Sequence, residues 1–314
     1  MTILHPQPIA DKENNNQPSQ LSYVLITAAR NEVSNIDRTI NCVIAQSVRP
    51  LRWIIVSDGS TDGTDELAMR YCARHDWIEL LRTQERSERN FAGKVAAFNA
   101  GYALVNNLPY DLIGNIDADI SFDKDFFAFL LTKFRANPHL GVGGAPFRQD
   151  EWSYDFKFSS IDHVSGACQL FRRQCFIDIG GYVPIKTGGI DVVAVLTARM
   201  RGWQTKTFTD KCYLHHRKMG TAKSNVLRAR YMDGQKDYSL GAHPVWVAFR
   251  AIYQMTKKPF ILNGSLLLAG YASSIIMRKE KAVSSELIRF RRRDQMRRLR
   301  EFLVSLVDGP RSHP

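Results

Sequence analysis

The sequence predicts an α/β fold, an open and mostly parallel β-sheet flanked by helices, with a helical C-terminal extension. Short apolar runs alternate with helical patterns through the first half of the 314 residues, which is the order expected of a parallel sheet. Polar clusters follow the first, second and fourth of these runs. They therefore stand where ligands bind in such sheets, beyond the C-terminal strand ends. The last third of the chain is helical in pattern and basic.

Each element follows from a local pattern of apolar residues. Residues 21–27 (LSYVLIT) are an apolar run of the kind buried in a parallel sheet, and a helix with Ser34 as its N-cap follows. The later patterns predict strands at 53–56, 78–81 and 111–116, with helices ending near His75 and spanning 93–106. Beyond Gly141 the regularity weakens, and the expected elements are strands at 141–145, 167–171 and 204–208 and a helix at 191–200.

Composition and cysteine content narrow the class of protein. With 44% hydrophobic and 24% charged residues the chain is ordinary for a folded protein, which excludes a collagen, a wholly disordered chain and a multispanning membrane protein. The five cysteines are odd in number and contain no C-x-x-C pair, so reduced thiols in the cytoplasm are expected. The N-terminus lacks the pattern of a signal peptide, and residues 1–20 are expected to form a flexible tail.

The net charge of +12 points to an anionic partner, in the form of nucleic acid, acidic lipid or a phosphorylated substrate. Its distribution is uneven. Between Arg278 and Arg300 ten basic residues stand against three acidic ones, a local charge of +7, so the other 291 residues carry only +5. The basicity is therefore mostly a property of the C-terminal region.

Asp117 and Asp119 close the apolar strand predicted at 111–116. Two carboxylates on the same side of a strand end can hold a divalent ion, and such an ion neutralises a diphosphate leaving group. A second acidic pair, Asp123 and Asp125, stands where a helix begins, so its expected role is N-capping and compensation of the helix dipole. Position therefore favours the first pair as the catalytic one.

Several short motifs follow one another in a set order along roughly residues 21–220. They are Asn31-Glu32, the acidic and hydroxyl-rich turn 57–64, Gly93-Lys94 with Asn99-Ala100-Gly101, Asp117-x-Asp119, Gly180-Gly181-Tyr182, Asp191, Arg199, Gly202 and the pair His215-His216. In this order the chain resembles the family 2 glycosyltransferases of the GT-A (nucleotide-diphospho-sugar transferase) fold, of the bacterial polysaccharide or glycolipid type. It departs from the family pattern at Ser57 and Ile190, where acidic residues are usual.

The resemblance implies a role for each matching residue. The implied donor-binding residues are Asn31, Glu32, Asp58, Lys94 and Asp117, the implied metal-binding residues are Asp117, Asp119 and one of His215 and His216, and the implied catalytic base is Asp191. Asp58 matches the aspartate that contacts uracil, and the metal expected is Mn²⁺ or Mg²⁺. Sequence alone does not choose between His215 and His216, and two histidines beside Arg217 can also form a solvated turn.

The resulting expectation is a metal-dependent, inverting glycosyltransferase of the hexosyltransferase type. It would move a sugar from a UDP-sugar to a saccharide or polyprenyl-linked acceptor in polysaccharide or glycoconjugate biosynthesis. Because the Gln-x-x-Arg-Trp motif of the processive synthases is absent, non-processive single addition is expected. The alternative enzyme is a sugar-1-phosphate nucleotidyltransferase, although residues 27–31 (TAARN) stand in place of its Gly-rich loop. The alternative from another class of protein is a basic nucleic-acid-binding protein. If the chain is a glycosyltransferase, we expect no nucleic acid among its partners.

Residues 260–277 carry no charge and are bracketed by Lys257-Lys258 and Arg278-Lys279. This stretch can be a short membrane span, an interfacial or re-entrant helix, or a buried helix. Residues 289–300 follow with arginines over an apolar stripe, which is typical of a helix on an anionic membrane surface. We therefore expect a catalytic domain over 21–220 and a membrane-associated extension over 221–314, at the cytoplasmic face of the inner membrane.

Overall fold

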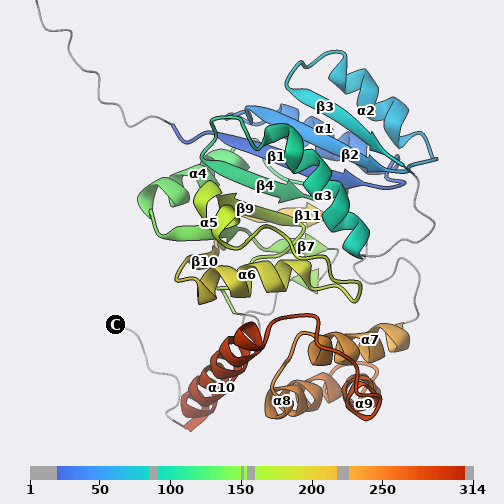
Figure 1. The fold of residues 1–314 in the computed structure, drawn as a ribbon, viewed down its shortest axis with the longest axis vertical. Coiled ribbons are helices and arrows are strands. Elements are labelled where there is room, and N and C mark those ends of the chain that lie inside the picture. The colour runs from blue at the N-terminus through green and yellow to red at the C-terminus, as the bar shows by residue number, and fades with distance from the viewer. Residues whose placement is uncertain (1–19, 85–90, 150–151, 154–159, 218–225, 308–314) are drawn as a thin grey trace, which may run out of the picture.

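A seven-stranded β-sheet forms the centre of the molecule (Figure 1). The computed structural model describes residues 20–84, 91–149, 152–153, 160–217 and 226–307, so most of the predicted N-terminal tail lies outside the described residues. Across the sheet the strand order is β10 (Gln204–Thr207), β6 (Leu140–Gly144), β9 (Cys168–Arg172), β4 (Leu112–Ile116), β1 (Tyr23–Ala29), β2 (Arg52–Asp58) and β3 (Ile78–Thr83). β9 runs antiparallel to β4 and β6, and the other pairings are parallel. The predicted α/β fold with a mostly parallel sheet is confirmed.

Helices cover both faces of this sheet. One face packs against α1 (Ile36–Ile44), α2 (Thr64–Cys72) and α4 (Phe126–Ala136), and the other against α3 (Phe91–Val105), α5 (Arg173–Asp178) and α6 (Ile190–Met200). In β1, Tyr23 and Leu25 belong to the first core, while Val24 and Ile26 belong to the second. The continuous apolar runs of the sequence are therefore strands that are buried on both faces.

A second sheet brings residues from late in the chain to the end of β4. Its order is β5 (Ile120–Ser121), β11 (Tyr213–His215), β7 (Phe147–Gln149) and β8 (Trp152–Ser153). These strands are not predicted from the sequence, because two or three residues are too few to show an alternating pattern. β11 pairs antiparallel with β5 and places His215 opposite Ile120. The pairing therefore sets His215 beside the predicted metal-binding carboxylates.

Two helix starts refine the sequence prediction. The N-cap of α1 is Asn35, and the prediction of Ser34 is wrong. Ser34 lies inside the preceding turn, in which the backbone N–H groups of Asn35 and Ile36 donate to the Glu32 carbonyl. Asp125 is the N-cap residue of α4, although its side chain makes no capping hydrogen bond. Its backbone N–H instead donates to Asp123 Oδ1 at 3.1 Å. The second acidic pair therefore belongs to this helix start.

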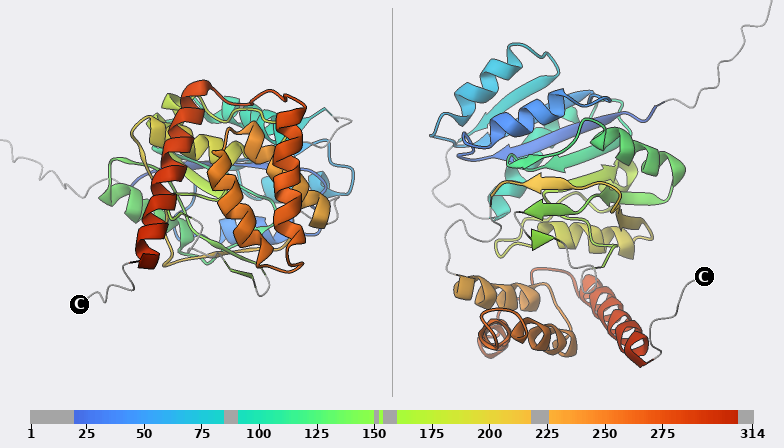
Figure 2. Two further views of the ribbon diagram at one scale, coloured as in Figure 1. Left: turned by 90° about the horizontal axis from the view of Figure 1, so that it is seen from below. Right: turned by 180° about the vertical axis from the view of Figure 1, so that it is seen from behind.

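Four further helices lie together beyond α6 (Figures 1 and 2), namely α7 (Val226–Ser239), α8 (Pro244–Met255), α9 (Leu262–Ile276) and α10 (Ser285–Val307). Glycines let α7 and α9 touch through their backbones. A Cβ on Gly270 would lie 1.9 Å from the Tyr231 carbonyl oxygen, and one on Gly234 would lie 2.0 Å from that of Leu267. Because only glycine lacks a Cβ, these positions permit no other residue without separating the helices.

The uncharged stretch at 260–277 folds mainly as α9. With 15 residues this helix is about 22 Å long at 1.5 Å per residue. The hydrocarbon core of a bilayer is about 30 Å thick. Within the described ranges, no helix combines the length and the hydropathy needed to span a membrane.

Part of the basic charge of the C-terminal region is used inside the molecule. On α10, Leu287 and Leu299 are buried, and Arg291 is only 8% exposed. Arg291 donates to Asp237 of α7 at 3.0 Å, and Arg292 donates to the Gly241 carbonyl at 3.1 Å. The exposed cations of α10 are Arg289, Arg293, Arg297 and Arg300. The basic coat predicted for this helix is therefore confined to its outward side.

Candidate active site

The turns after β1 and β2 meet beyond the sheet and are joined by hydrogen bonds. Asn31 adopts a left-handed φ of +55°, and its Oδ1 accepts from the Thr61 N–H at 2.9 Å. Asp58, the last residue of β2, is 8% exposed, and its Oδ2 lies 3.9 Å from the Arg30 guanidinium. The structure thus brings the two turns with predicted nucleoside contacts together.

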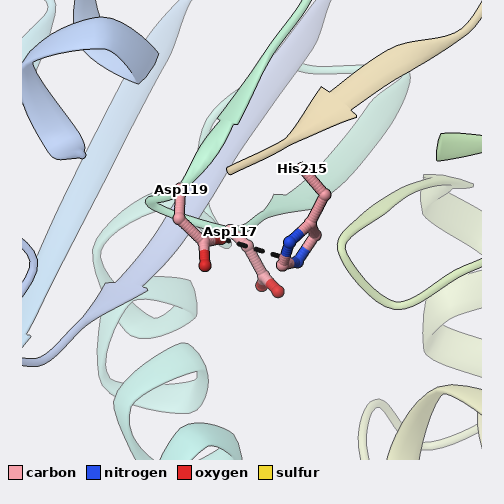
Figure 3. Close-up of side chains that lie close together, drawn as sticks. All are labelled: Asp117, Asp119 and His215. Carbon is pink, nitrogen blue, oxygen red and sulfur yellow. Dashed lines mark ion pairs between the residues drawn. The ribbon is translucent and has the colours of Figure 1, made fainter. Parts of the chain in front are cut away.

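Asp117, Asp119 and His215 form a compact cluster at the end of β4 (Figure 3). One ligand atom from each lies within 4.8 Å of the others, and His215 Nε2 is 3.7 Å from Asp119 Oδ1. His215 Nδ1 lies 2.6 Å from the Arg217 carbonyl, which can only accept, so Nδ1 carries the hydrogen. This bond leaves the lone pair of Nε2 facing the carboxylates, the arrangement that orients histidine as a metal ligand.

The two carboxylates of this cluster are crowded. Burial, together with the charge of Asp117, raises the pKa of Asp119 above its usual value, while His215 and Arg217 oppose the rise. A divalent cation between the side chains would relieve that repulsion. Two carboxylate oxygens and an imidazole nitrogen are a donor set that Mn²⁺ accepts. The residues present therefore fit the metal implied by the family resemblance.

Lys94, on α3, forms an ion pair with Asp117. Burial alone would lower the pKa of Lys94, but the charges of Asp117, Asp191 and Asp119 outweigh it and raise the pKa above its usual value. The ammonium group therefore stays charged beside the cluster. A permanent cation at this point suits a site that receives an anionic group.

The two histidines occupy different environments. His215 is 8% exposed, whereas His216 is half-buried and its Nε2 lies 2.8 Å from Ser121 Oγ. Arg217 donates to Glu32 Oε2 at 2.7 Å, which ties β11 to the turn after β1. The predicted alternative of a solvated turn is therefore wrong for His215, and the geometry selects His215 over His216 for the cluster.

A cavity of about 230 Å³ lies between the end of β4 and the start of α6. Its lining includes Lys94, Asn115, Asp117, Gln169, Tyr182 and Asp191. Asp191 stands in the first turn of α6, where the helix dipole favours a negative carboxylate. Two residues with separately predicted roles, Asp117 and Asp191, therefore face the same small space.

Gly166 lies directly against Asp191 and holds its carboxylate. Its N–H donates to Asp191 Oδ2 at 3.2 Å, and a Cβ at this position would lie only 2.7 Å from the Cβ of Asp191. The carbonyl of the same residue accepts from Asn115 Nδ2 at 2.6 Å. The segment that precedes β9 therefore links the end of β4 to the predicted base.

Asn115, Gln169 and Tyr182 are cavity residues to which the sequence analysis assigned no role. Asn115 and Gln169 face each other across the β4–β9 pair and are 3% and 1% exposed. Burial and the charges of Asp191 and Asp117 raise the pKa of Tyr182 well above its usual value, so its hydroxyl stays protonated and donates to Gln169 Oε1 at 2.6 Å. An amide inside the apolar run DLIGNI, two residues before Asp117, is the signal that could have identified Asn115.

Residues 24–180, which are half of the chain, match the sequence model of a protein family described as glycosyl transferase family 2. The matched segment contains Asp58, Lys94, Asp117 and Asp119. The chain belongs to glycosyl transferase family 2. As a family 2 protein it is a glycosyltransferase, and the nucleotidyltransferase and nucleic-acid-binding alternatives are not retained.

Curated relatives of this family 2 protein are bacterial polysaccharide synthases. The poly-beta-1,6-N-acetyl-D-glucosamine synthase of Staphylococcus aureus is 26% identical over an alignment of 201 residues, and the match covers 58% of this chain and 46% of the relative. The synthase of the same name from Staphylococcus epidermidis is 25% identical over an alignment of 189 residues, and the match covers 54% of this chain and 43% of the relative. The chain thus spans about half the length of the curated relatives it matches.

Solved structures share the fold of this family 2 protein at low sequence identity. The mannosyltransferase PcManGT from Pyrobaculum calidifontis, in complex with GDP-Man and Mn²⁺, has a TM-score of 0.56 and 17% identity, with 92% of this chain and 81% of that chain covered. S. aureus TarS 1–349 in complex with UDP-GlcNAc has a TM-score of 0.54 and 11% identity, with 93% of each chain covered. These likenesses support the GT-A fold assignment.

Proposed function

We propose that this glycosyltransferase moves a sugar from a UDP-sugar to a hydroxyl group of a saccharide or polyprenyl-linked acceptor, with inversion and with Mn²⁺ or Mg²⁺ as cofactor. The observation that carries the proposal is the shared cavity, which Asp117 of the acidic cluster and Asp191 both line. A leaving group held at one wall and a base at the other is the arrangement that a single displacement requires.

The nucleoside is assigned to the turns after β1 and β2. Asp58 can accept a hydrogen bond from a nucleobase N–H, and Asn31 and Glu32 lie in the neighbouring turn. UDP is preferred because TarS carries UDP-GlcNAc in its complex and the curated relatives are named as N-acetylglucosamine polymer synthases. The GDP-Man complex of PcManGT makes GDP-sugars the comparison to run.

Asp117, Asp119 and His215 would hold the metal ion. When bound, the ion would supply positive charge that stabilises the diphosphate as it leaves. Lys94 adds a fixed cation next to Asp117 and orients the same anionic group. Asp191 acts as the base: Gly166 occupies its Oδ2, so Oδ1 takes the proton from the attacking hydroxyl.

We further propose that the chain adds one sugar at a time and rests on the cytoplasmic face of the inner membrane, with catalysis in residues 21–220 and membrane contact in residues 221–314. The support is an uncharged outer surface on two neighbouring helices. On α8 the exposed residues Val245, Ala248 and Ile252 follow helical spacing, and on α9 Leu262, Ser265, Ala269, Ala272 and Ile276 do the same. We call these eight residues the α8–α9 surface.

None of the eight residues of the α8–α9 surface belongs to the core that the two helices share. Helices α8 and α9 themselves lie at the front in the view from below in Figure 2. Ile252 is 63% and Ile276 is 81% exposed. Exposed Lys257, Lys258, Arg278 and Lys279 stand at the two ends of α9. Such an apolar face can insert into a bilayer while its basic rim binds anionic lipid headgroups. Because cytoplasmic leaflets are anionic, we place the contact on the cytoplasmic side.

The test of the catalytic proposal is release of nucleoside diphosphate from a panel of UDP- and GDP-sugars. The full chain is assayed with Mn²⁺, with Mg²⁺ and with EDTA, in the presence of simple saccharide acceptors. We expect turnover of at least one UDP-sugar that EDTA abolishes and Mn²⁺ restores. Turnover confined to GDP-sugars would reject the donor assignment, and full activity in EDTA would reject the metal.

A further inference from the structure

One buried polar atom of the cavity has no partner among the residues that the structure describes. This atom is Asn115 Oδ1, which belongs to a side chain only 3% exposed. A buried carbonyl oxygen without a donor is unfavourable, because it has lost its hydrogen bonds to water and gained none from the protein. Because Asn115 lines the cavity, a molecule bound there can supply the missing donor.

The orientation of the Asn115 amide is fixed by its other contact. Nδ2 donates to the Gly166 carbonyl at 2.6 Å, and the reverse orientation would set two carbonyl oxygens against each other. Gln169, its cross-strand neighbour, is fully engaged by comparison: its Oε1 accepts from Tyr182 and its Nε2 donates to the Val164 carbonyl at 2.8 Å. The side-chain oxygen of Asn115 therefore lacks a hydrogen-bond donor, whereas that of Gln169 has one.

The surroundings of Asn115 indicate which part of the substrate meets it. Asp117, which follows β4 two residues after Asn115, marks the diphosphate end of the cavity, and Asp191 marks the end where the acceptor hydroxyl attacks. The group that lies between a leaving diphosphate and a base is the sugar being transferred. Asn115, Gln169 and Tyr182 are neutral, which suits a ring that carries hydroxyl groups.

We propose that Asn115 Oδ1 accepts a hydrogen bond from a hydroxyl or amide N–H group of the transferred sugar and so determines which donor the enzyme uses. This inference rests on the proposed function, because it places the donor sugar in the cavity. Through Nδ2 and Gly166 the same side chain also supports Asp191. Asn115 is thus a specificity-determining residue toward the sugar and a positioning residue toward the base.

The experiment measures kcat/KM of wild type and of Asn115→Leu. The substrates are the UDP-sugar that wild type uses best and the monodeoxy analogues of that sugar. If the best sugar carries a 2-acetamido group, the set includes the analogue that is 2-deoxy at this position. For wild type we expect one analogue to lose about 10–100-fold in kcat/KM, the cost of leaving one buried acceptor unpaired. In Asn115→Leu the ratio between parent sugar and that analogue should fall to about one. Loss of the hydrogen bond to Gly166 should lower kcat/KM for all donors by the same factor. The ratio of kcat/KM between parent sugar and analogue therefore reports only the contact of Asn115 with the sugar.

A matched control separates this effect from general damage. Asn263→Leu makes the same change at an amide that is 1% exposed and also has an unpartnered Oδ1, but lies on α9 outside the cavity lining. This variant should keep the wild-type ratio. Asn115→Ser, with the smaller side chain, repeats the test if thermal unfolding shows that the leucine variant does not fold.

The outcomes distinguish this inference from the function on which it rests. If wild type releases diphosphate from no nucleotide sugar, the proposed function fails. If wild type is active and its discrimination among analogues survives unchanged in both Asn115 variants, the donor sugar does not contact Asn115 and the inference is overturned. A change in discrimination among acceptors alone would also overturn it, because the cavity would then hold the acceptor.

Discussion

Arg199 of α6 donates two hydrogen bonds to Asp294 of α10, at 2.8 and 3.1 Å. Arg297 donates a third to the same carboxylate at 2.8 Å. Burial would raise the pKa of Asp294, but these hydrogen bonds outweigh it and hold the pKa below its usual value. Since Asp191 stands in the first turn of α6, these hydrogen bonds connect the helix of the predicted base to the C-terminal helices.

Asp294→Asn should lower the free energy of unfolding by about 1.5–3 kcal/mol at pH 7, the range for hydrogen bonds to a charged group. A carboxyl whose folded pKa is depressed contributes its stability above its unfolded pKa of about 3.9 and loses it as the pH falls below that value. Urea unfolding at pH 7 and near pH 3 should therefore show the gap between variant and wild type shrinking in acid. A gap of equal size at both pH values contradicts the assignment. Glu301→Gln, which removes the exposed partner of Arg297, should change stability by less than about 0.5 kcal/mol.

His215→Ala and His216→Ala form a matched pair for the metal site. Only His215 directs a ring nitrogen at Asp119, so His215→Ala should weaken Mn²⁺-dependent activity by about 10–100-fold. His216→Ala should retain activity close to wild type. Titration of activity with Mn²⁺ measures both variants, and an equal loss in the two would mean that the selection of His215 is wrong.

Asp191→Asn removes the proposed base with little change in shape. The rate constant kcat should fall by about 10²–10⁴-fold, the contribution of a general base, while UDP still binds with an affinity near that of wild type. Asp178→Asn is the control, since that exposed carboxylate accepts a hydrogen bond from the indole of the half-buried Trp203. Turnover measurements give kcat, and equilibrium binding of UDP gives the affinity. A variant that keeps its kcat would remove Asp191 from the mechanism.

Gly166→Ala should impair catalysis more than stability. The added methyl group would lie 2.7 Å from the Cβ of Asp191 and push the carboxylate away from its hydrogen bond. We expect kcat to fall by about tenfold or more, since small displacements of a catalytic group are costly. Gly143→Ala introduces a contact of 2.8 Å with Phe134 outside the cavity lining and should affect mainly thermal stability. Equal effects of both substitutions on kcat would argue against a positioning role for Gly166.

Ile276→Glu tests the α8–α9 surface. Burying an isoleucine side chain contributes about 1.5–3 kcal/mol, so its replacement should reduce binding to liposomes containing anionic phospholipid by about tenfold or more. Ile177→Glu changes an isoleucine that is 50% exposed on α5 and should bind like wild type. Co-sedimentation with vesicles is the measurement. Binding that is absent in wild type, or equally reduced in both variants, would reject the membrane proposal.

The elements that could be predicted from the sequence are those in which one local pattern decides the structure. The apolar runs that became β1, β2 and β4 are buried on both faces and are bounded by polar turns, so Asp58 and Asp117 could be placed at strand ends. The cavity could not be predicted in full, because Gly166 and Gln169 come from an irregular region. Their positions depend on the antiparallel insertion of β9 between β4 and β6. The choice of His215 likewise needed the register of β11, a strand of three residues.

The backbone contact of α7 with α9 at Gly234 and Gly270 bears on which acceptors the enzyme can reach. Helices that touch main chain to main chain cannot slide past one another without a clash, so α7 and α9 keep a fixed position relative to each other. On a bilayer, the α8–α9 surface would then sit at one fixed height below the cavity. Only an acceptor whose hydroxyl group stands at that height above the lipid would reach Asp191. The thickness of the helical layer would therefore set the length of acceptor that the enzyme can use.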